Sequence, residues 1–450
     1  MVPRPWLVLA FAVLSALAAA VLAGASGQGE LLGGPVTLQY AFWGDQDVID
    51  ATNACLNRYM AKNPNVKIEA LNFGSSAQFD TEVTTLAAGG SLPDLGYFSA
   101  PNVLPWGISG QFVDLTDVYK KGPARLDALK FVTPDGRIVA VSVSNEIQVI
   151  WYNRKPFDQA GLPYPPAEAG RAWNWDQFVG VARKLTRDAN GRGPDDSGFD
   201  PSNVRGFGAW VRNGRIPWII LAISNGGGFV SDDGKSLLLD RPETIEAIQK
   251  VADLVNVEHV GPAPGTPQVP TGVADALASQ QVAMAMDGTR DLLAVGLTRE
   301  QQGLDFGIGV LPYMKKLATA SVGTPIVVYR SSNHVSEALK LLQFVMSPES
   351  SLPLLRSGRW LPDEARWYTE SSLVSQWVDN PRHPPQYRTA VVDFALNYSH
   401  RLPECYVPTY SRMDDIVEPA LQQVWLGQRT AEDVIENEIM PKITPIFEGK

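Results

Sequence analysis

The amino-acid sequence predicts an α/β protein of two lobes, in which a mostly parallel sheet flanked by helices forms each lobe. The chain has 450 residues, which is more than one hydrophobic core usually serves. Its 45% hydrophobic and 19% charged residues are typical of a globular protein. Between residues 36 and 71 a strand pattern, a helix pattern and a second strand pattern follow one another. This βαβ order predicts parallel strands covered by helices.

The chain starts with a long apolar segment. Arg4 is the one basic residue before an uncharged stretch, residues 6–23, which is followed by Gly-Ala-Ser. This pattern is typical of a secretory signal peptide at residues 1–25 with an A-x-A cleavage site. The apolar run is also just long enough to span a bilayer, so an uncleaved anchor stays open. Because no cysteine stands near the cleavage site, we expect an exported protein, in the periplasm or at the cell surface, that is not a lipoprotein.

The first lobe begins with clear strand and helix patterns. Large apolar residues alternate with smaller ones from Val36 to Phe42, which indicates a strand. The loop at residues 99–106 follows a later strand, and ligands of open α/β sheets bind at the carboxyl ends of parallel strands. We expect strands at residues 36–42, 66–71 and 92–98 and helices at residues 47–62 and 79–88.

A carboxylate stands inside the next apolar stretch. Residues 139–153 predict a strand, and residues 154–161 predict a short helix closed by Gly161. Glu146 lies in the middle of this strand pattern, where a carboxylate is costly unless it is hydrogen-bonded. Three interpretations stay open: an edge or crossover position, an arginine partner, or a polar ligand.

The rest of the chain continues the α/β pattern. Asn174 and Gln177 form an Asn variant of the capping box at the start of a helix. Residues 188–196 superficially resemble a calcium loop, but Arg192 stands where an oxygen ligand is needed, so we expect a polar turn rather than a metal site. Further strands are expected at residues 206–210, 282–288, 306–312 and 323–329, and further helices at residues 174–185, 219–224, 242–257, 273–278, 335–346, 414–426 and 431–440.

The two cysteines are expected to be unpaired. An exported protein with a large core does not need a disulfide, and Cys55 falls on the apolar side of its predicted helix. We therefore interpret Cys55 as a buried free thiol. A bridge between Cys55 and Cys405 stays open as the alternative.

Charge and motifs argue against nucleic-acid binding and catalysis. The formal net charge is −10, whereas a nucleic-acid partner requires a basic face. The four histidines are far apart, and we find no nucleophile elbow, P-loop or dinucleotide fingerprint. We expect no enzyme, no metal and no cofactor. A secreted glycoside-active enzyme and a cell-surface interaction protein without a small ligand remain the alternatives.

Several motifs together resemble one known family. Glu146 stands six residues before Tyr152-Asn153, a basic residue and Phe157 follow, and Trp-Asn-Trp-Asp-Gln-Phe ends at Phe178. Later come an Ala-Met strand that ends at Gly288 and the sequence Gly-Arg-Trp-Leu-Pro at residues 358–362. This combination resembles the extracellular solute-binding proteins similar to maltose-binding protein, which capture sugars for ABC importers. The resemblance covers nearly all of the mature chain, although each motif is loose.

The resemblance implies a ligand cleft between two lobes that the chain crosses three times. The first lobe would comprise residues 36–143 plus 326–360, and the second lobe residues 147–322 plus 363–450. A monomer would capture a mono- or oligosaccharide, or a phosphorylated polyol, by closing its lobes on the ligand. The closed form would then dock on a membrane permease. No nucleic acid would be involved.

The resemblance also implies which residues contact the ligand. Two of them have a strong packing alternative, Trp218 and Trp360, which could be core or hinge residues. Tyr410 and Arg412 could be surface residues ahead of the last helices, and Asp45 could cap a helix. The expected ligand contacts are Trp43, Asp45, Ser99, Asn102, Glu146, Trp218, Arg290, Trp360, Tyr410 and Arg412.

One position departs from the family pattern. Many members have Gly-x-Trp after the Ala-Met strand, with that tryptophan stacked on the sugar, whereas this chain has Gly288-Thr-Arg290. Arginine also offers a flat face, but it adds a fixed charge and five donors. The hypothesis is that the ligand is heavily hydroxylated or carries a negative group.

Overall fold

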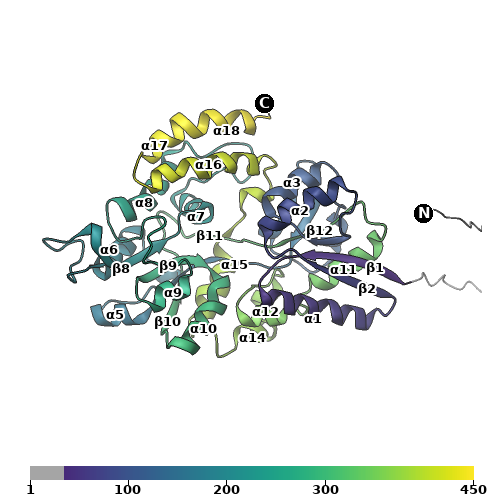
Figure 1. Cartoon of the computed structure of the whole chain (residues 1–450), viewed down its shortest axis with the longest axis horizontal. Coiled ribbons are helices and arrows are strands. Elements are labelled where there is room, and N and C mark those ends of the chain that lie inside the picture. Colours follow the sequence, from purple (N-terminus) through teal and green to yellow (C-terminus); the bar gives the residue numbers. More distant parts are fainter. Residues whose placement is uncertain (1–34, 450) are drawn as a thin grey trace, which may run out of the picture. The chain divides into compact units, whose positions relative to one another are not determined.

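Two mixed sheets, each covered by helices, organise the chain (Figure 1). A computed structural model describes residues 35–449, so the predicted signal peptide at residues 1–25 lies outside the described residues. We call the bodies built around the two sheets the first lobe and the second lobe. This arrangement confirms the predicted two-lobe α/β class. The exact residue bounds predicted for the lobes stay a prediction.

The first lobe is built on six strands. They are β1 (Val36–Phe42), β2 (Val66–Asn72), β3 (Leu95–Tyr97), β4 (Lys130–Val132), β5 (Ile138–Ser142) and β12 (Pro325–Val328). Their order is β2-β1-β3-β12-β5-β4. The pairs β1–β2 and β1–β3 are parallel, as the βαβ pattern predicted, whereas β12 is antiparallel to both β3 and β5.

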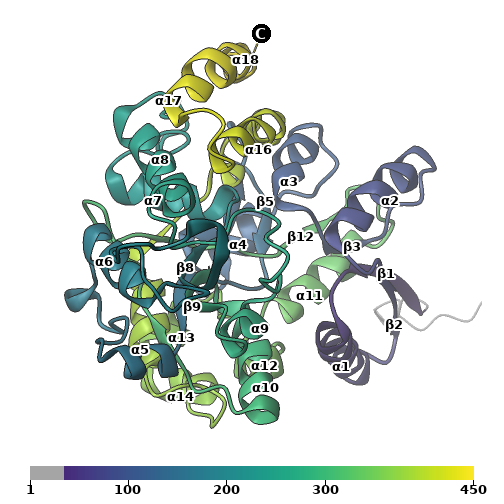
Figure 2. The same cartoon turned by 60° about the vertical axis from the view of Figure 1, so that its left-hand side comes forward.

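Helices cover both faces of the first sheet (Figure 2). The alternation along β1 explains this, because Leu38, Tyr40 and Phe42 enter one apolar cluster and Ala41 enters the other. The first cluster includes residues of α1 and α11, and the second includes residues of α2 and α3. The helices of this lobe are α1 (Gln46–Lys62), α2 (Ser76–Ala88), α3 (Ala100–Ile108), α4 (Thr116–Lys121), α11 (Val335–Val345) and α12 (Leu352–Ser357).

The second lobe has a five-stranded sheet in the order β10-β6-β9-β8-β7. Its strands are β6 (Gln148–Asn153), β7 (Arg187–Asp188), β8 (Val204–Val211), β9 (Val282–Gly288) and β10 (Phe306–Gly309). Only the pair β8–β9 is parallel. The prediction of mostly parallel sheets is therefore corrected to mixed sheets. Strands β6 and β12, which each follow a crossing between the lobes, are antiparallel to both of their neighbours, and the pairs β4–β5 and β7–β8 are also antiparallel. A small parallel pair joins β11 (Thr319–Ala320) to β13 (Ser399–His400).

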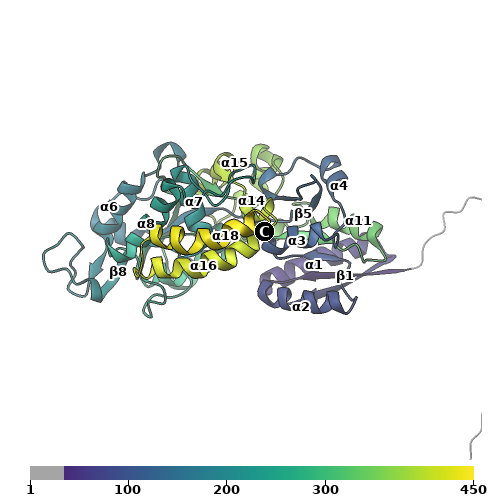
Figure 3. The same cartoon turned by 90° about the horizontal axis from the view of Figure 1, so that it is seen from above.

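The helices of the second lobe surround one large apolar cluster. Helices α16 and α18 pack against each other along one side (Figure 3). No helix in the described part of the chain is both long enough and apolar enough for a membrane crossing. The helices are α5 (Arg154–Ala160), α6 (Trp175–Leu185), α7 (Arg215–Asn225), α8 (Pro242–Asn256), α9 (Val273–Ala278), α10 (Leu292–Gln302), α13 (Arg366–Thr369), α14 (Ser371–Val378), α15 (Phe394–Tyr398), α16 (Tyr410–Trp425), α17 (Ala431–Val434) and α18 (Met440–Phe447).

Three neighbouring segments carry the chain between the two sheets. Residues 143–147 join β5 to β6, and their backbone pairs with the other two crossings: Asn145 exchanges hydrogen bonds with Leu361, and Glu146 with Val322. The prediction of one continuous strand over residues 139–153 is therefore wrong. The backbone groups of the crossing segments find partners in each other rather than in either sheet, which divides the strand in two.

Three local predictions have a clear outcome. Cys55 and Cys405 are both free and buried, so the bridge is not formed. At the expected polar turn, the carboxylate of Asp188 accepts backbone N–H groups of Asn190, Arg192 and Asp200. The expected loop at residues 99–106 is wrong, because α3 fills it. Pro101 lies in the first turn of α3, where the missing N–H costs nothing.

Candidate binding groove

Two adjoining cavities of about 160 and 460 Å³ lie between the lobes. They share Trp43, Arg290 and residues 322–324, so we treat them as one interlobe groove. The first lobe contributes mostly apolar and small residues, whereas the second lobe contributes charged ones. The groove is lined by Trp43, Gly44, Val48, Ser76, Tyr97, Phe98, Ser99, Ala100, Pro101, Ala128, Leu129, Phe131, Ser142, Ser144, Asn145, Glu146, Arg215, Arg290, Ser321, Val322, Gly323, Thr324, Pro325, Arg359, Trp360, Glu404 and Cys405.

The carboxyl ends of β1 and β3 supply the first-lobe wall. Trp43 follows β1, and its ring lies 5.2 Å from that of Phe79 and 5.4 Å from that of Tyr97, measured between centroids. Ser99 follows β3 and lines the groove. Burial raises the pKa of Asp80, and the neighbouring side chains of Ser99 and Asn102 act in the opposite direction. Asn102 is not among the lining residues.

Glu146 and Arg290 meet on the lining of the groove. Nη1 of Arg290 donates to Oε1 of Glu146 at 2.7 Å. Burial raises the pKa of Glu146, and the Arg290 guanidinium acts in the opposite direction. Gly288 makes this approach possible, because a Cβ at that position would lie 2.5 Å from Oε1 of Glu146. The structure therefore combines two of the three interpretations left open for Glu146: a crossover position and an arginine partner.

A chain of charges extends from this pair into the second lobe. Nη2 of Arg290 lies 3.5 Å from Oδ1 of Asp287, and Asp287 also pairs with Arg212. Glu146 and Asp287 together raise the pKa of Arg290 and offset its charge. Burial, with a further contribution from Asp287, raises the pKa of Asp291 to about 7. The groove therefore presents Arg290 as a neutralised hydrogen-bond donor and not as an isolated cation.

Asp45 reaches an arginine rather than its own helix. It stands at the N-cap of α1, but its side chain makes no cap bond there. Instead its Oδ2 accepts from Nη2 of Arg359 at 2.7 Å. Arg359 lines the groove, whereas the Asp45 side chain is 77% exposed at its edge. The alternative that the Asp45 side chain caps α1 is therefore wrong.

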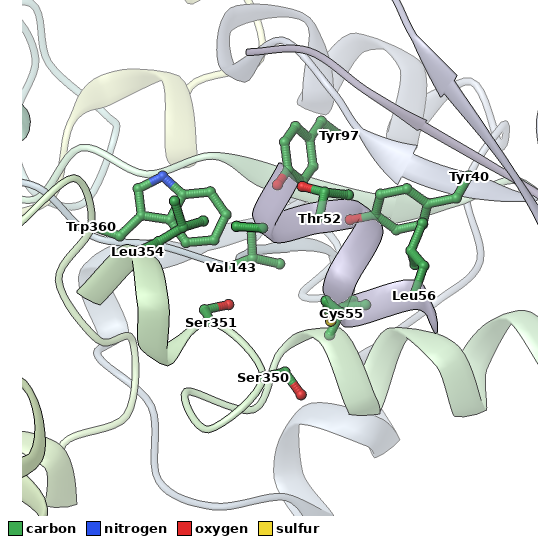
Figure 4. A pocket seen from close by; sticks show the side chains of 12 residues that line it. Tyr40, Thr52, Cys55, Leu56, Tyr97, Val143, Ser350, Ser351, Leu354 and Trp360 are labelled. Carbon is green, nitrogen blue, oxygen red and sulfur yellow. The ribbon is translucent and has the colours of Figure 1, made fainter. Parts of the chain in front are cut away.

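Trp360 and Tyr97 form a thin wall behind the groove. Both residues line the groove and also a small cavity of about 20 Å³ within the first lobe (Figure 4). That volume is enough for about one water molecule. Trp360 also packs against the apolar clusters of both lobes. Trp360 is therefore both a packing residue between the lobes and a residue that lines the groove.

The remaining predicted contacts do not line the groove. Trp218 is 1% exposed within α7, and its Nε1 donates to Oε1 of Glu418 at 2.8 Å. Tyr410 is fully buried in the first turn of α16, which begins earlier than predicted, and its hydroxyl donates to Asp414. Arg412 is exposed on the same helix. A ligand role for these residues stays a prediction.

Three charged residues that line the groove were not predicted from the sequence: Arg215, Arg359 and Glu404. Arg359 had a signal, because it precedes Trp360 in a family motif. Arg215 and Glu404 had none, since they are far apart in the sequence and meet only in the fold, with 3.2 Å between Nη2 and Oε1. In the described part of the chain no cluster of three or more His, Cys, Asp or Glu side chains is placed to hold a metal ion.

Comparisons with known proteins identify the relatives of this chain. The sequence pattern of the bacterial extracellular solute-binding protein family matches residues 43–351. A cyclic α-maltosyl-1,6-maltose-binding protein from Arthrobacter globiformis has a similar structure, with a TM-score of 0.73, 21% identity and coverage of 93% of this chain and 100% of that chain. UgpB from Mycobacterium tuberculosis, solved with glycerophosphocholine, has a TM-score of 0.72 at 19% identity and covers 93% of this chain and 99% of that chain.

A third relative corrects one prediction. A Streptomyces antibioticus protein is 24% identical over 453 residues, which is 96% of this chain and 90% of the relative, and it is named an uncharacterized lipoprotein. The prediction that the protein is not a lipoprotein is therefore wrong. It rested only on the lack of a cysteine before residue 55, in a segment that lies mostly outside the described residues. A similarity that extends over nearly the whole chain outweighs that argument.

Proposed function

Because the chain belongs to the family of bacterial extracellular solute-binding proteins, we propose that it captures a carbohydrate between its lobes for an ABC importer. The ligand is a mono- or oligosaccharide or a phosphorylated polyol. The observation that carries this proposal is the Glu146–Arg290 pair in a groove flanked by Trp43 and Trp360. Relatives that bind a maltosyl-maltose and glycerophosphocholine support this ligand range.

The chemistry of the groove suits polyhydroxylated molecules. A sugar hydroxyl both donates and accepts, so it can bridge the Glu146 carboxylate and the Arg290 guanidinium. The ring of a sugar also has apolar C–H faces, which the indoles of Trp43 and Trp360 can cover at low entropic cost. Asp45 at the rim of the groove and Ser99 on its wall can bind further hydroxyls of the ligand. Four of the predicted residues could contact a ligand only after the groove changes shape: Asn102, Trp218, Tyr410 and Arg412.

Capture proceeds by lobe closure. The lobes sample open and closed arrangements, and a ligand that touches both lobes favours the closed one. The three hydrogen-bonded crossings at residues 145–146, 322 and 361 are the natural hinge, because they are the segments that connect the two sheets and a few residues there can absorb the backbone changes of closure. The closed surface then docks on the permease. The importer's ATPase supplies the energy.

We also propose what the protein is not. Its relatives are substrate-binding proteins and not enzymes, so we propose that it binds without catalysis, as a monomer, without a cofactor and without nucleic acid. A secreted glycoside-active enzyme would release reducing sugar from glycans. An interaction protein without a small ligand would show no thermal shift with any saccharide.

A thermal-shift screen tests the proposal. Wild-type protein, Arg290→Met and a surface control, Arg382→Met, would be screened against mono-, oligo- and phosphorylated saccharides. A ligand at one hundred times its Kd stabilises the wild type by about 2.7 kcal/mol. Loss of the Arg290 donor should weaken binding at least about tenfold, because charged hydrogen bonds contribute about 1.5–3 kcal/mol. No shift of the wild type with any compound would overturn the proposal.

A further inference from the structure

A short segment of the second lobe carries a carboxylate into the groove. Residues 401–406 leave β13 and reach the first lobe, where Nη2 of Arg401 donates to the carbonyl oxygen of Lys130 at 3.0 Å. Cys405 is buried in an apolar cluster of the first lobe. These contacts hold Glu404, which is 3% exposed, on the wall of the groove.

The carboxylate of Glu404 is only half satisfied. Its Oε1 pairs with Nη2 of Arg215 at 3.2 Å. Its Oε2 is buried and has no hydrogen-bond partner among residues 35–449. Buried carboxylate oxygens in native proteins nearly always have a partner, because an unmade bond carries the full desolvation cost. Glu404 lines the groove and therefore brings to it a carboxylate with one buried acceptor that still lacks a donor.

The surroundings of Glu404 hold more carboxyl groups than guanidinium groups, although burial raises the pKa of Asp414 to about 6 and also raises that of Glu418. Arg215 is shared, since its Nη1 also lies 3.7 Å from Oδ2 of Asp414. Glu418 adds a third carboxylate to this group, bonded to the indole of Trp218. One guanidinium thus faces three carboxylates. Arg401 is nearby, but its Nη2 donates to the carbonyl oxygens of Lys130 and Cys405.

We propose that Glu404 binds a protonated amino group of the ligand, so that the groove selects an amino sugar. This inference rests on the proposed function and adds a specificity-determining residue to it. A neutral hydroxyl would fill the vacant acceptor but leave the excess charge. A protonated amine fills the vacant acceptor and also offsets the charge. Hydrogen bonds between charged partners are about twice as strong as neutral ones. An N-acetyl group removes the charge and adds bulk, so the acetylated sugar should bind worse.

Matched sugars test the inference. Titration calorimetry at about pH 6, well below the usual pKa of an amine, would compare each sugar as its neutral, amino and N-acetylated form. The probes are glucose, glucosamine and N-acetylglucosamine and the corresponding β-1,4-linked disaccharides. For the wild type we expect one amino form to bind at least about tenfold tighter than its neutral and acetylated counterparts.

Two variants and one control separate the possible results. Glu404→Gln keeps the shape but removes the charge, and it should abolish the preference for the amino form over the neutral form. Asp414→Asn, which does not line the groove, should reduce the preference in part. The exposed control Glu432→Gln should retain it. Equal binding of neutral and amino forms by the wild type, or an unchanged preference in Glu404→Gln, would overturn this inference and leave the proposed function standing. If the wild type bound none of these six sugars, this inference would fall, and the wider thermal-shift screen would decide the proposed function separately.

Discussion

At the scale of single residues, Gly288 decides whether Glu146 and Arg290 can meet. A side chain at this position would begin 2.5 Å from Oε1 of Glu146, which is closer than atoms approach without displacement. We expect Gly288→Ala to move the Glu146 carboxylate and to weaken ligand binding at least about tenfold. Gly296→Ala in α10, where a Cβ meets nothing within 4 Å, is the matched control. Calorimetry that found equal affinities for both variants would contradict this role of Gly288.

His383 makes the stability depend on pH. It is 8% exposed, and its burial lowers its pKa from 6.5 to about 4. The unfolded chain therefore takes up a proton where the folded chain does not, so the free energy of unfolding falls as the pH is lowered from 6.5 to about 4. Between about pH 7 and 4.5 this residue should cost about 2 kcal/mol. Urea unfolding would measure the drop in the free energy of unfolding between these two pH values, and the drop should be smaller by that amount in His383→Gln than in the wild type. An equal drop in the variant and the wild type would contradict this role of His383.

The sequence predicted the centre of the groove but not its charged wall. Glu146 stood out because a carboxylate in an apolar strand needs a reason, and Arg290 stood out because it replaces a tryptophan of the family pattern. Arg215 and Glu404 are single charged residues next to apolar ones in the sequence, with no motif that links them. Only tertiary packing brings their charges within reach of each other. Long-range ion pairs of this kind leave no local pattern to read.

At the scale of elements, the capping box of α6 is a direct link from sequence to stability. The side chain of Asn174 accepts the N–H of Gln177 at 2.9 Å, and the Gln177 side chain accepts the N–H of Asn174 at 3.0 Å. We expect Asn174→Ala to lower the free energy of unfolding by about 1 kcal/mol. Asn174→Ser, which preserves the cap, should lose much less. Denaturant midpoints that did not differ between the two variants would argue against the cap.

Elements with strong local patterns were predicted best. The patterns at residues 36–42 and 282–288 match β1 and β9 in full. The strand expected at residues 139–153 is divided in the structure, because a local pattern does not show where the chain crosses between lobes. The loop expected at residues 99–106 is helix α3, because the first turn of a helix tolerates a proline. The start of α16 was also missed, which moved Tyr410 from the surface into the core.

At the scale of the whole molecule, the fold explains why one groove can join two separate sheets. The three crossings lie side by side and hold each other through backbone hydrogen bonds. Each lobe has its own apolar cluster or clusters, so each can move as a rigid body about these crossings. The predicted two lobes followed from chain length and motif resemblance, and the similarity to solved binding proteins confirms them.

Small-angle X-ray scattering tests most directly whether a ligand closes the lobes around it. The radius of gyration of the full chain would be measured with and without the tightest saccharide from the thermal-shift screen. A ligand that contacts both walls of the groove, as proposed, favours the closed form, so we expect the radius of gyration to decrease at saturation. The decrease should be lost in Arg290→Met at the same ligand concentration. Tight binding with an unchanged radius of gyration would contradict capture between the lobes.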